Sequence, residues 1–275
     1  MEGALAGRHP RRITLGLCAP LLLLYGLALL FPLLATLEAS VGSPPSLDFL
    51  SKATSSQGYR PIFVRTLTIA FWTTVWTVGL ALPVAAFIAR ASARGQRFML
   101  AIVLFSAGIP VVIRTFGWMA WLQRTGIVNS VLVWLGFEPA DLMFNAFGNY
   151  VGLIHVFLPF AILPIYASLA EIDPKLSWAA LSLGASPTRH FATVTLPLIL
   201  PSVLLGGAMV FVLSLGAFIT PRLLGGRTEV MVAVVIEDLI RLGQKNTSAA
   251  LAVTLTAVCL VSLGLARRVV GARPS

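Results

Sequence analysis

The residues of this sequence that could carry chemistry are few and lie far apart. The histidines His9, His155 and His190 form no cluster with acidic residues, and no pair of carboxylates lies within a stretch long enough to cross a membrane. Cys18 and Cys259 lie in apolar runs, without a partner at the spacing of a metal site. The sequence also lacks the G-x-x-x-x-G-K-[ST] phosphate loop. We therefore expect no catalytic residue, metal or cofactor, and any ATP hydrolysis would belong to another polypeptide.

Two arginines lie inside otherwise apolar stretches, where an ionisable side chain is costly enough that a functional role is the default hypothesis. Arg65 lies near one end of its stretch, so its long side chain can also simply reach the membrane surface. Arg114 lies deeper, where it can face a transport pathway or brace a loop by donating hydrogen bonds to carbonyls. Both alternatives stay open for each arginine. A bare cation in a pathway would suit an anionic solute better than a cationic one.

Three acidic residues, Glu229, Glu237 and Asp238, precede the last apolar stretch. If they face a pathway, they can attract a cation. If they lie on the polar face of a surface helix, they are solvated and need no further role. The sequence leaves both interpretations open.

The elements that must position these residues are long apolar helices. Hydrophobic residues make up 57% of the chain and charged residues 11%, whereas a soluble domain usually carries about 25% charged residues. A helix needs about 20 residues to cross a bilayer, and only a helix satisfies the backbone of an isolated span. We therefore predict an all-α polytopic membrane protein whose six transmembrane helices are Ile13–Leu37, Ile62–Ala89, Phe98–Leu122, Val151–Leu169, Leu198–Thr220 and Ala249–Ala266.

The net charge of +10 does not indicate a nucleic-acid groove, because the basic residues lie in short clusters between apolar stretches. If the N-terminus is cytoplasmic, the inner segments carry about twice the density of Lys and Arg of the outer loops. We therefore predict that both termini are cytoplasmic. The first stretch is predicted to be a retained helix, since its apolar run is about twice the usual 7–15 residues of a signal peptide. Two short apolar segments near residues 131–137 and 230–240 should lie at the outer interface or pack on the bundle.

A segment between the fourth and fifth predicted spans, Glu171–Pro197, has the local signals of two short helices, and we call it the elbow. Asp173 can cap the first helix, with Pro174 in the next position, and Gly184 suits the left-handed residue that ends it. A second serine–proline cap signal follows, and Pro197 and Pro201 mark the entry to the next span. By the alternation of spans, the elbow should lie in the cytoplasm.

One face of the first elbow helix is apolar and shallow. Leu176, Ala179, Ala180 and Leu183 fall at positions i, i+3, i+4 and i+7 of a helix. Such a stripe suits docking in a groove of a partner protein, because the alanines let another backbone approach closely. The alternative is a loop that packs on its own bundle. The opposite face carries Lys175, Trp178 and Ser182.

The elbow resembles a known signature. Ala179-Ala180, three residues, Gly184, nine residues and then the Val194–Pro197 run resemble the EAA loop of ABC-importer permeases. The resemblance implies a MetI-like permease of the binding-protein-dependent, type I family, whose loop docks on a separate ATPase. Trp178 departs from the pattern, since the family usually carries glutamate there, so the usual acidic face is neutral or basic here. The implied ATPase-coupling residues are Leu176, Trp178, Ala179, Ala180, Leu183, Gly184, Leu196 and Pro197.

Further motifs extend the resemblance over residues 60–266. The series Ile109-Pro110, Arg114, Trp118, Gly126, Asn129 is similar to the third span of spermidine/putrescine permeases, and residues 158–169 and 216–226 resemble their fourth span and fifth-span exit. The resemblance to this PotB/PotH-like branch implies a polyamine as the first candidate solute, with an anion, an opine or an amino-acid-like solute as the alternative. The candidate residues of the translocation pathway are Arg114, Trp118, Phe218, Glu237 and Asp238.

The resemblance also implies partners: two copies of an ABC ATPase subunit, a second permease subunit that is usually a paralogue, a periplasmic solute-binding protein, and the lipid of the bacterial inner membrane. The expected organisation is an N-terminal segment, first helix and periplasmic loop (1–61), an ABC transmembrane domain (62–266) and a cytoplasmic tail (267–275). A gradient-driven secondary transporter is the competing hypothesis. It is disfavoured because the halves show no convincing repeat and the spans lack acidic residues.

Overall fold

The regular structure of the chain is helical. The computed structural model describes residues 11–42 and 47–271, and within them it contains helices and no strand. Residues 1–10 and 272–275 at the predicted cytoplasmic ends, with His9 among them, and the side chain of Cys18 lie outside the described residues. The helices are α1 Arg11–Val41, α2 Asp48–Ser55, α3 Arg60–Arg90, α4 Ala93–Gly108, α5 Val111–Leu122, α6 Ile127–Trp134, α7 Ala146–Glu171, α8 Pro174–Ser182, α9 Pro187–His190, the π-helix η1 Phe191–Thr195, α10 Leu196–Leu215, α11 Ile219–Leu224, α12 Val232–Arg241 and α13 Lys245–Gly271.

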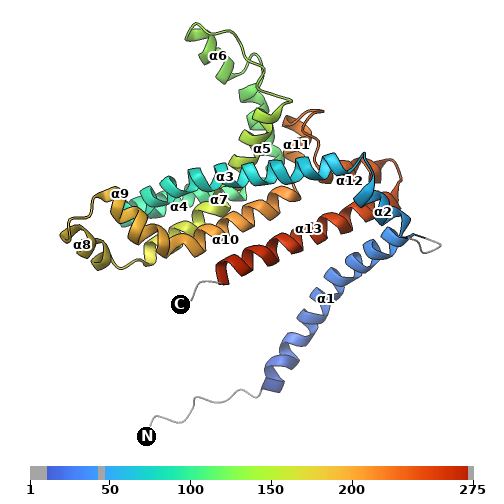
Figure 1. The fold of residues 1–275 in the computed structure, drawn as a ribbon, viewed down its shortest axis with the longest axis horizontal. Coiled ribbons are helices and arrows are strands. Elements are labelled where there is room, and N and C mark those ends of the chain that lie inside the picture. The colour runs from blue at the N-terminus through green and yellow to red at the C-terminus, as the bar shows by residue number, and fades with distance from the viewer. Residues whose placement is uncertain (1–10, 43–46, 272–275) are drawn as a thin grey trace.

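Three long helices, α3, α7 and α10, pack against one another and form the centre of a bundle (Figure 1). Their shared core includes the fully buried side chains of Ile69, Leu153, Ile165, Ile199 and Val210. Helix α13 lies along α10 and α12. Helix α1 meets α13 and α2 near one end of the bundle and diverges from the bundle toward its own beginning.

Two glycines let the central helices approach closely. A Cβ on Gly152 of α7 would lie 2.5 Å from Cγ2 of Thr220 on α11, and a Cβ on Gly206 of α10 would lie 3.2 Å from Cγ of Pro164 on α7. At Gly152 these distances leave room only for the hydrogen of glycine. At Gly206 a methyl group would fit only if Pro164 shifted by a few tenths of an ångström. Small residues at such positions are typical of helix packing in membranes, where van der Waals contact drives association.

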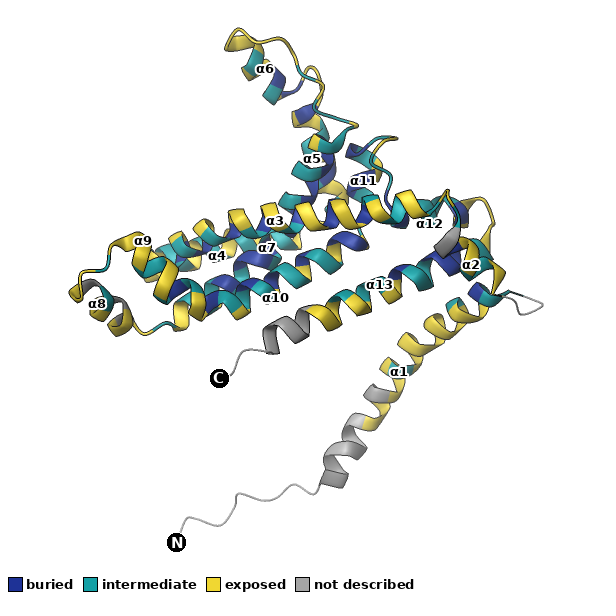
Figure 2. Cartoon of the chain, viewed as in Figure 1, coloured by how far each residue is buried: buried dark blue, intermediate teal, exposed yellow. Residues whose placement is uncertain are grey.

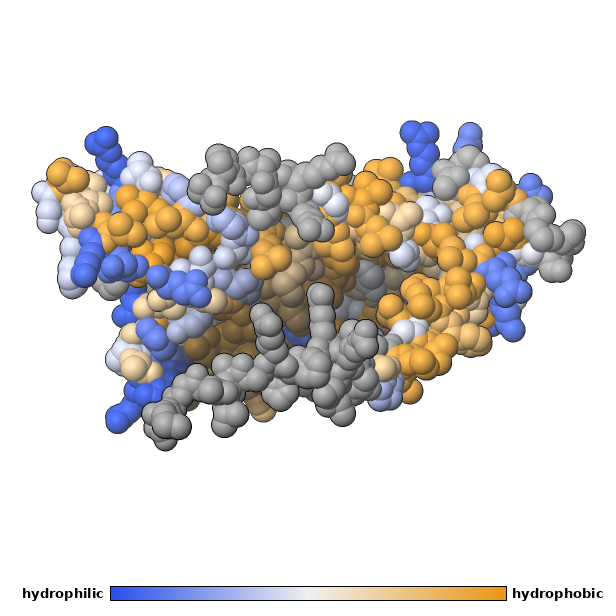
Figure 3. Space-filling view, turned by 90° about the horizontal axis from the view of Figure 1, so that it is seen from below, coloured by the Kyte–Doolittle hydropathy of each residue, from blue (hydrophilic) through white to orange (hydrophobic). Residues whose placement is uncertain are grey.

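Seen from below, the bundle is largely apolar and its polar side chains gather toward the two ends (Figure 3), and exposed residues follow the outer side of most helices (Figure 2). Large hydrophobic side chains point outward from several helices, including Phe31 (74% exposed), Phe105 (74%) and Leu260 (64%). A water-soluble protein rarely exposes apolar patches of this extent, whereas lipid covers them without cost. Five helices are long and apolar enough to cross a membrane, or six if one bent pair counts as a span. The predicted all-α polytopic fold is confirmed.

The prediction was wrong about the third span, Phe98–Leu122, which is not one helix. Helices α4 and α5 meet at a break at Ile109 and Pro110, and α4 is bent by 98° from the segment Val111–Trp134, which contains α5 and α6. Pro110 has no N–H to donate to the preceding turn, and its ring forces the residue before it into an extended conformation, which Ile109 adopts with ψ of 129°. Helix α5 therefore stands across the bundle and not along it (Figure 1).

The two short apolar segments of the predicted outer loops behave differently from each other. Helix α12 packs on the bundle through Val232 and Leu239, which are 1% and 7% exposed. Helix α6 stands away from the bundle, and its last residue, Trp134, is 82% exposed. The loop after α6 is fixed by the fully buried Asn129, whose side chain bonds the carbonyl and amide of Ala140 at 3.1 and 2.8 Å.

Candidate functional site

The elbow projects from one end of the bundle, at the left in Figure 1. Asp173 caps α8, because its Oδ1 accepts a hydrogen bond from the amide of Lys175 at 2.9 Å. The turn after α8 depends on Gly184, whose φ of +82° is the left-handed conformation that favours glycine. Ser186 caps the next helix by accepting from the amide three residues later at 3.3 Å. The predicted caps and turn of the elbow are confirmed.

The apolar stripe of α8 is mostly uncovered within this chain. Leu176 is 48% exposed, Ala179 is exposed and Ala180 is half-buried. Leu183, at the end of the stripe, is 89% exposed, which is the highest exposure of any large hydrophobic side chain in the described part of the chain. The elbow therefore does not pack its stripe on its own bundle.

Trp178 lies on the other side of α8, toward the bundle. Together with Arg90 at the end of α3 and His190 of α9, it lines a cavity of about 260 Å³. The indole is nevertheless 66% exposed. Trp178, which departs from the EAA-loop pattern that the sequence resembles, thus lies beside the base of the elbow.

The prediction was wrong about the end of the elbow, where the second helix is not separate from the next span. Residues Pro187–Leu215 run as one helix, which passes through the π-turn η1 into α10. The amide of Leu196 donates to the carbonyl of Phe191, five residues back, and Pro197 follows in the first turn of α10. The wider π-turn tolerates a proline here, since the missing N–H falls where the hydrogen-bond pattern changes. Leu196 packs against the bundle core, and Pro197 is exposed.

Arg114 lies on α5, just past the break, and ties this helix to α7. Its Nη1 donates a hydrogen bond to the carbonyl of Val156 at 3.2 Å, while its Nε is buried without a hydrogen-bond partner in the described part of the chain. The same side chain lines a cavity of about 290 Å³ together with Phe218, which is 43% exposed. The structure thus brings Arg114 and Phe218 together and shows the bracing hydrogen bond.

Trp118, one turn further along α5, contacts other aromatic rings. Its indole packs edge-to-face on the ring of His155 at 5.6 Å and on that of Trp121 at 5.9 Å. It is not among the residues that line the cavity of Arg114 and Phe218. The five candidate pathway residues therefore fall in three places: Arg114 with Phe218, Trp118 beside His155, and the acidic pair on α12.

The acidic pair of α12 is matched by arginines. Asp238 accepts two hydrogen bonds from the guanidinium of Arg222 at 2.6 and 2.8 Å, and Glu237 lies 3.3 Å from the same guanidinium. Glu237 also pairs with Arg241, one turn along α12. The hydrogen bonds from Arg222 hold the pKa of Asp238 below its ordinary value. Because two arginines balance two carboxylates, this cluster offers little net attraction to a cation.

The sequence pattern did not reveal Arg222 or two buried hydroxyl contacts. The hydroxyls of Thr115 and Thr220 lie 3.2 Å apart and join α5 to α11, and the hydroxyl of Thr66 accepts from the amide of Val232 at 2.9 Å. These threonines sit in apolar runs, where a hydroxyl usually bonds its own helix. Arg222 follows closely after a predicted span, and an arginine at such a place is also typical of an anchor at the membrane interface. Its type and position therefore did not indicate a pairing with Asp238.

The profile of one protein family matches most of this chain. The model of the binding-protein-dependent transport system inner membrane component matches residues 81–273, which include all of α5, the elbow, α10 and α12.

Individual relatives agree with that match. The spermidine/putrescine transport system permease protein PotB of Escherichia coli (strain K12) is 29% identical over 203 residues, covering 73% of this chain and 74% of that protein. The inner membrane ABC transporter permease protein YdcU of the same organism is 31% identical over 219 residues, covering 74% and 69%. A chain from the crystal structure of a bacterial alginate ABC transporter, in complex with an alginate pentasaccharide-bound periplasmic protein, superposes with a TM-score of 0.76 at 20% identity, over 93% of this chain and 92% of that chain.

Proposed function

Because this chain belongs to the family of binding-protein-dependent transport system inner membrane components, we propose that it is the permease half of an ATP-driven importer in which the elbow transmits the action of a separate ATPase. The observation that carries the proposal is the exposed stripe of α8. A row of apolar side chains on an element that stands clear of the lipid-facing part of the bundle needs a protein partner.

The dimensions of the elbow support docking in a groove. Helix α8 has nine residues, and its ends are fixed by the Asp173 cap and the left-handed Gly184. A short helix with fixed ends loses little conformational freedom on binding, so more of its contact energy appears as affinity. We propose Leu176, Trp178, Ala179, Ala180, Leu183 and Gly184 as the coupling residues. Leu196 and Pro197 act through the joint between the elbow and α10.

We propose alternating access as the mechanism. Closure of two ATPases around ATP moves the two elbows of a permease pair toward each other. The continuous helix from Pro187 to Leu215 carries this motion into the bundle core, because no break separates α9, the second helix of the elbow, from α10. Arg114 and the α5–α7 contact that it makes would move with that core. No covalent chemistry on the solute is needed.

The proposed surroundings follow from the family and from the sequence. The complex would contain two ATPase subunits, a second permease subunit that is a paralogue, and a periplasmic solute-binding protein. The elbow end would face the cytoplasm with both termini, and α12 and α6 the periplasm. The proposed division into residues 1–61, 62–266 and 267–275 places the elbow within the transmembrane domain.

For the solute, a polyamine is the first candidate, because the relative PotB is a spermidine/putrescine permease. One observation favours a different class. The acidic pair that could attract a polyamine is neutralised by Arg222 and Arg241, and Arg114 leaves a cation near the centre of the bundle. An anionic or amino-acid-like solute is therefore the second candidate.

The docking proposal is tested by Leu183→Asp. Leu183 is 89% exposed, so the change should leave folding of the chain within about 0.5 kcal/mol of wild type. We expect it to abolish co-purification of the ATPase, because a buried unpaired carboxylate costs several kcal/mol at an interface.

Leu242→Asp is the matched control, since Leu242 is also exposed (72%) after a short helix, at the opposite end of the bundle. Normal ATPase recovery with Leu183→Asp, or an equal loss with both variants, would refute docking through the elbow.

A further inference from the structure

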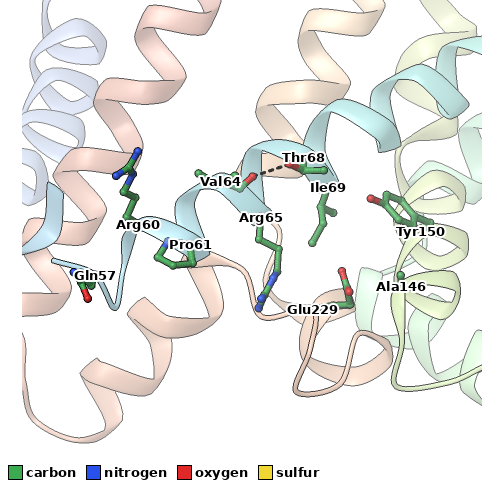
Figure 4. A pocket seen from close by; sticks show the side chains of 10 residues that line it. All are labelled: Gln57, Arg60, Pro61, Val64, Arg65, Thr68, Ile69, Ala146, Tyr150 and Glu229. Carbon is green, nitrogen blue, oxygen red and sulfur yellow. Dashed lines mark hydrogen bonds between the residues drawn. The ribbon is translucent and has the colours of Figure 1, made fainter. Parts of the chain in front are cut away.

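A cavity of about 730 Å³ lies at the end of the bundle opposite the elbow, between the beginnings of α3 and α7 and the loop that precedes α12 (Figure 4). Its walls mix apolar residues such as Val64 and Ile69 with six polar side chains: Gln57, Arg60, Arg65, Thr68, Tyr150 and Glu229. This volume is typical of sites for small molecules, which are usually apolar clefts with a few converging polar groups.

Two charged groups of this cavity, on Arg65 and Glu229, face the same space and form no ion pair in the described part of the chain. Arg65 descends from α3 and Glu229 rises from the loop before α12, so that their charged ends reach into the same space in Figure 4. Both side chains are half-buried. Among the described residues, neither Arg65 nor Arg60 forms an ion pair, whereas Arg222 pairs closely with an acidic residue at the same end of the bundle. A separated pair around a cavity leaves room for a ligand with complementary charges.

A buried amide beside Glu229 also lacks partners. Asn149 is fully buried, and neither its Nδ2 nor its Oδ1 makes a hydrogen bond in the described part of the chain. A Cβ on Gly225 would lie 3.3 Å from Cγ of Asn149 and 3.1 Å from Cβ of Glu229, so the two side chains flank the same glycine. An unsatisfied buried amide costs about 1–3 kcal/mol. Because Asn149 is fully buried and does not line the cavity, a buried water between it and Glu229, and not the ligand itself, would remove that cost.

We propose that this cavity binds a zwitterion, with an anionic group against Arg65 and a primary ammonium against Glu229. A guanidinium binds a carboxylate or phosphate through short charge-assisted hydrogen bonds, and a carboxylate binds an ammonium in the same way. A diamine would place one ammonium beside Arg65, and a dianion would place one anionic group beside Glu229. Both are disfavoured by like charges in a partly desolvated site.

The same chemistry could come from two sources, namely a transported amino-acid-like solute or the head group of phosphatidylethanolamine. The second source is relevant because α3 begins at the cavity and Val64 beside it is 56% exposed on the apolar surface. We call the experiment for a transported solute the solute arm and the experiment for a lipid head group the lipid arm. The solute arm rests on the proposed function and narrows its solute class. The lipid arm does not depend on transport.

The solute arm uses three probes with the same four-carbon chain and different charges: putrescine, γ-aminobutyrate and succinate. Their binding to the complete purified complex is measured without ATP, in nanodiscs of phosphatidylglycerol. We expect γ-aminobutyrate to bind at least tenfold more tightly than either of the other probes. Arg65→Gln should weaken it about tenfold and bring its affinity close to that of putrescine. Glu229→Gln should weaken it to a similar extent and bring it close to succinate.

Arg227→Gln is the matched control, because Arg227 is exposed on the same loop and does not line the cavity. It should leave all three affinities unchanged. If Arg65 and Glu229 serve only the packing of the loop, their variants will alter the three probes equally, which would contradict the proposal.

The lipid arm measures which lipid stays bound in native mass spectrometry after purification from an equal mixture of phosphatidylethanolamine and phosphatidylglycerol. Selective retention of phosphatidylethanolamine, lost in Glu229→Gln, identifies the lipid as the source. Preference for putrescine or succinate, or no preference among the probes together with no selective lipid, overturns the proposal. Failure of the proposed function is a separate outcome, since it appears as normal recovery of the ATPase with Leu183→Asp.

Discussion

At the residue scale, two arginines of this chain satisfy their guanidinium groups in different ways. Arg222 satisfies its guanidinium with two carboxylates, and Arg114 uses one backbone carbonyl and leaves Nε unpaired. The sequence could identify Arg114 as unusual, because an ionisable group in an apolar stretch is rare. It could not identify the partner, since Val156 lies on another helix and any residue type supplies a carbonyl.

The bracing role of Arg114 predicts a graded series of variants. Arg114→Met removes the hydrogen bond to Val156, which should lower the free energy of unfolding by about 1–3 kcal/mol. Arg114→Lys should retain most of it, because only one nitrogen of the guanidinium donates to that carbonyl and an ammonium can replace it. Thermal unfolding in detergent checks both. The control is Arg124→Gln, at an arginine whose side chain is 72% exposed, and it should change stability by less than about 0.5 kcal/mol. Equal effects of Met and Lys at position 114 would contradict a bracing role for the hydrogen bond to Val156.

The pair between Arg222 and Asp238 predicts a pH dependence with a defined sign. The hydrogen bonds from Arg222 lower the folded-state pKa of Asp238 below the ordinary value of an aspartate carboxyl. The stability that this pair adds is therefore present above the unfolded-state pKa, about 3.9, and is lost as the pH falls through the lower folded-state pKa. The carboxyl carbon-13 shift of Asp238 should titrate below its ordinary range, and Arg222→Gln should raise the midpoint. An unchanged midpoint in that variant would show that the hydrogen bonds do not act as described.

At the scale of elements, the sequence predicted which segments are helical better than where they bend. Five apolar stretches became single long helices, because their length and composition leave no other structure in lipid. The break at Pro110 was missed because prolines inside spans are often tolerated, as at Pro159 and Pro164 of α7. What distinguishes Pro110 is tertiary: α5 is held across the bundle by Arg114 and by the Thr115–Thr220 contact.

The caps of the elbow were predictable because they are local, whereas the π-turn was not. Asp173 and Gly184 act on residues within one helical turn, so their types suffice. The fusion of α9 with α10 depends on how the bundle holds Leu196, which packs on the core. The positions of the candidate pathway residues were likewise not predictable from local sequence, because their separation into three places depends on the bend after α4.

The left-handed turn of the elbow predicts that Gly184→Val uncouples the complex. Valine at a φ of +82° is strained by about 1–2 kcal/mol, and the strain falls on the turn that orients the end of the stripe. Gly136→Val is a matched control, because Gly136 has a φ of +87° and, like Gly184, has nothing within 4 Å of an added Cβ. Both variants should fold with a similar loss of stability, and only Gly184→Val should lose solute uptake and ATPase co-purification. Normal uptake and co-purification in that variant would exclude a coupling role for the turn.

At the scale of the whole molecule, the proposed docking surface and the proposed ligand cavity lie at opposite ends of the bundle, and a buried core lies between them. The elbow and its exposed stripe lie at one end, and the cavity of Arg65 and Glu229 and the ion pairs of α12 lie at the other. The buried core of α3, α7 and α10 connects them. Work done on the elbow can reach the far end only through that core, because packed interiors transmit displacement and do not absorb it.

This arrangement predicts that transport depends on ATP and not on an ion gradient. The chain carries no phosphate loop, and in the described part of the chain the long helices that could span a membrane hold acidic residues only near their ends, at Glu38 of α1 and Glu171 of α7. No carboxylate therefore lies midway along these helices, where the proton relays of gradient-driven transporters often have one. In proteoliposomes with the complete complex, uptake should stop when ATP is withdrawn and continue when the proton gradient is clamped at zero. A variant of the ATPase subunit that binds ATP but cannot hydrolyse it should behave as if ATP were absent after a single turnover. Uptake that persists without ATP and collapses with the gradient would instead support a secondary transporter, and the exposed stripe of α8 would then require a different partner.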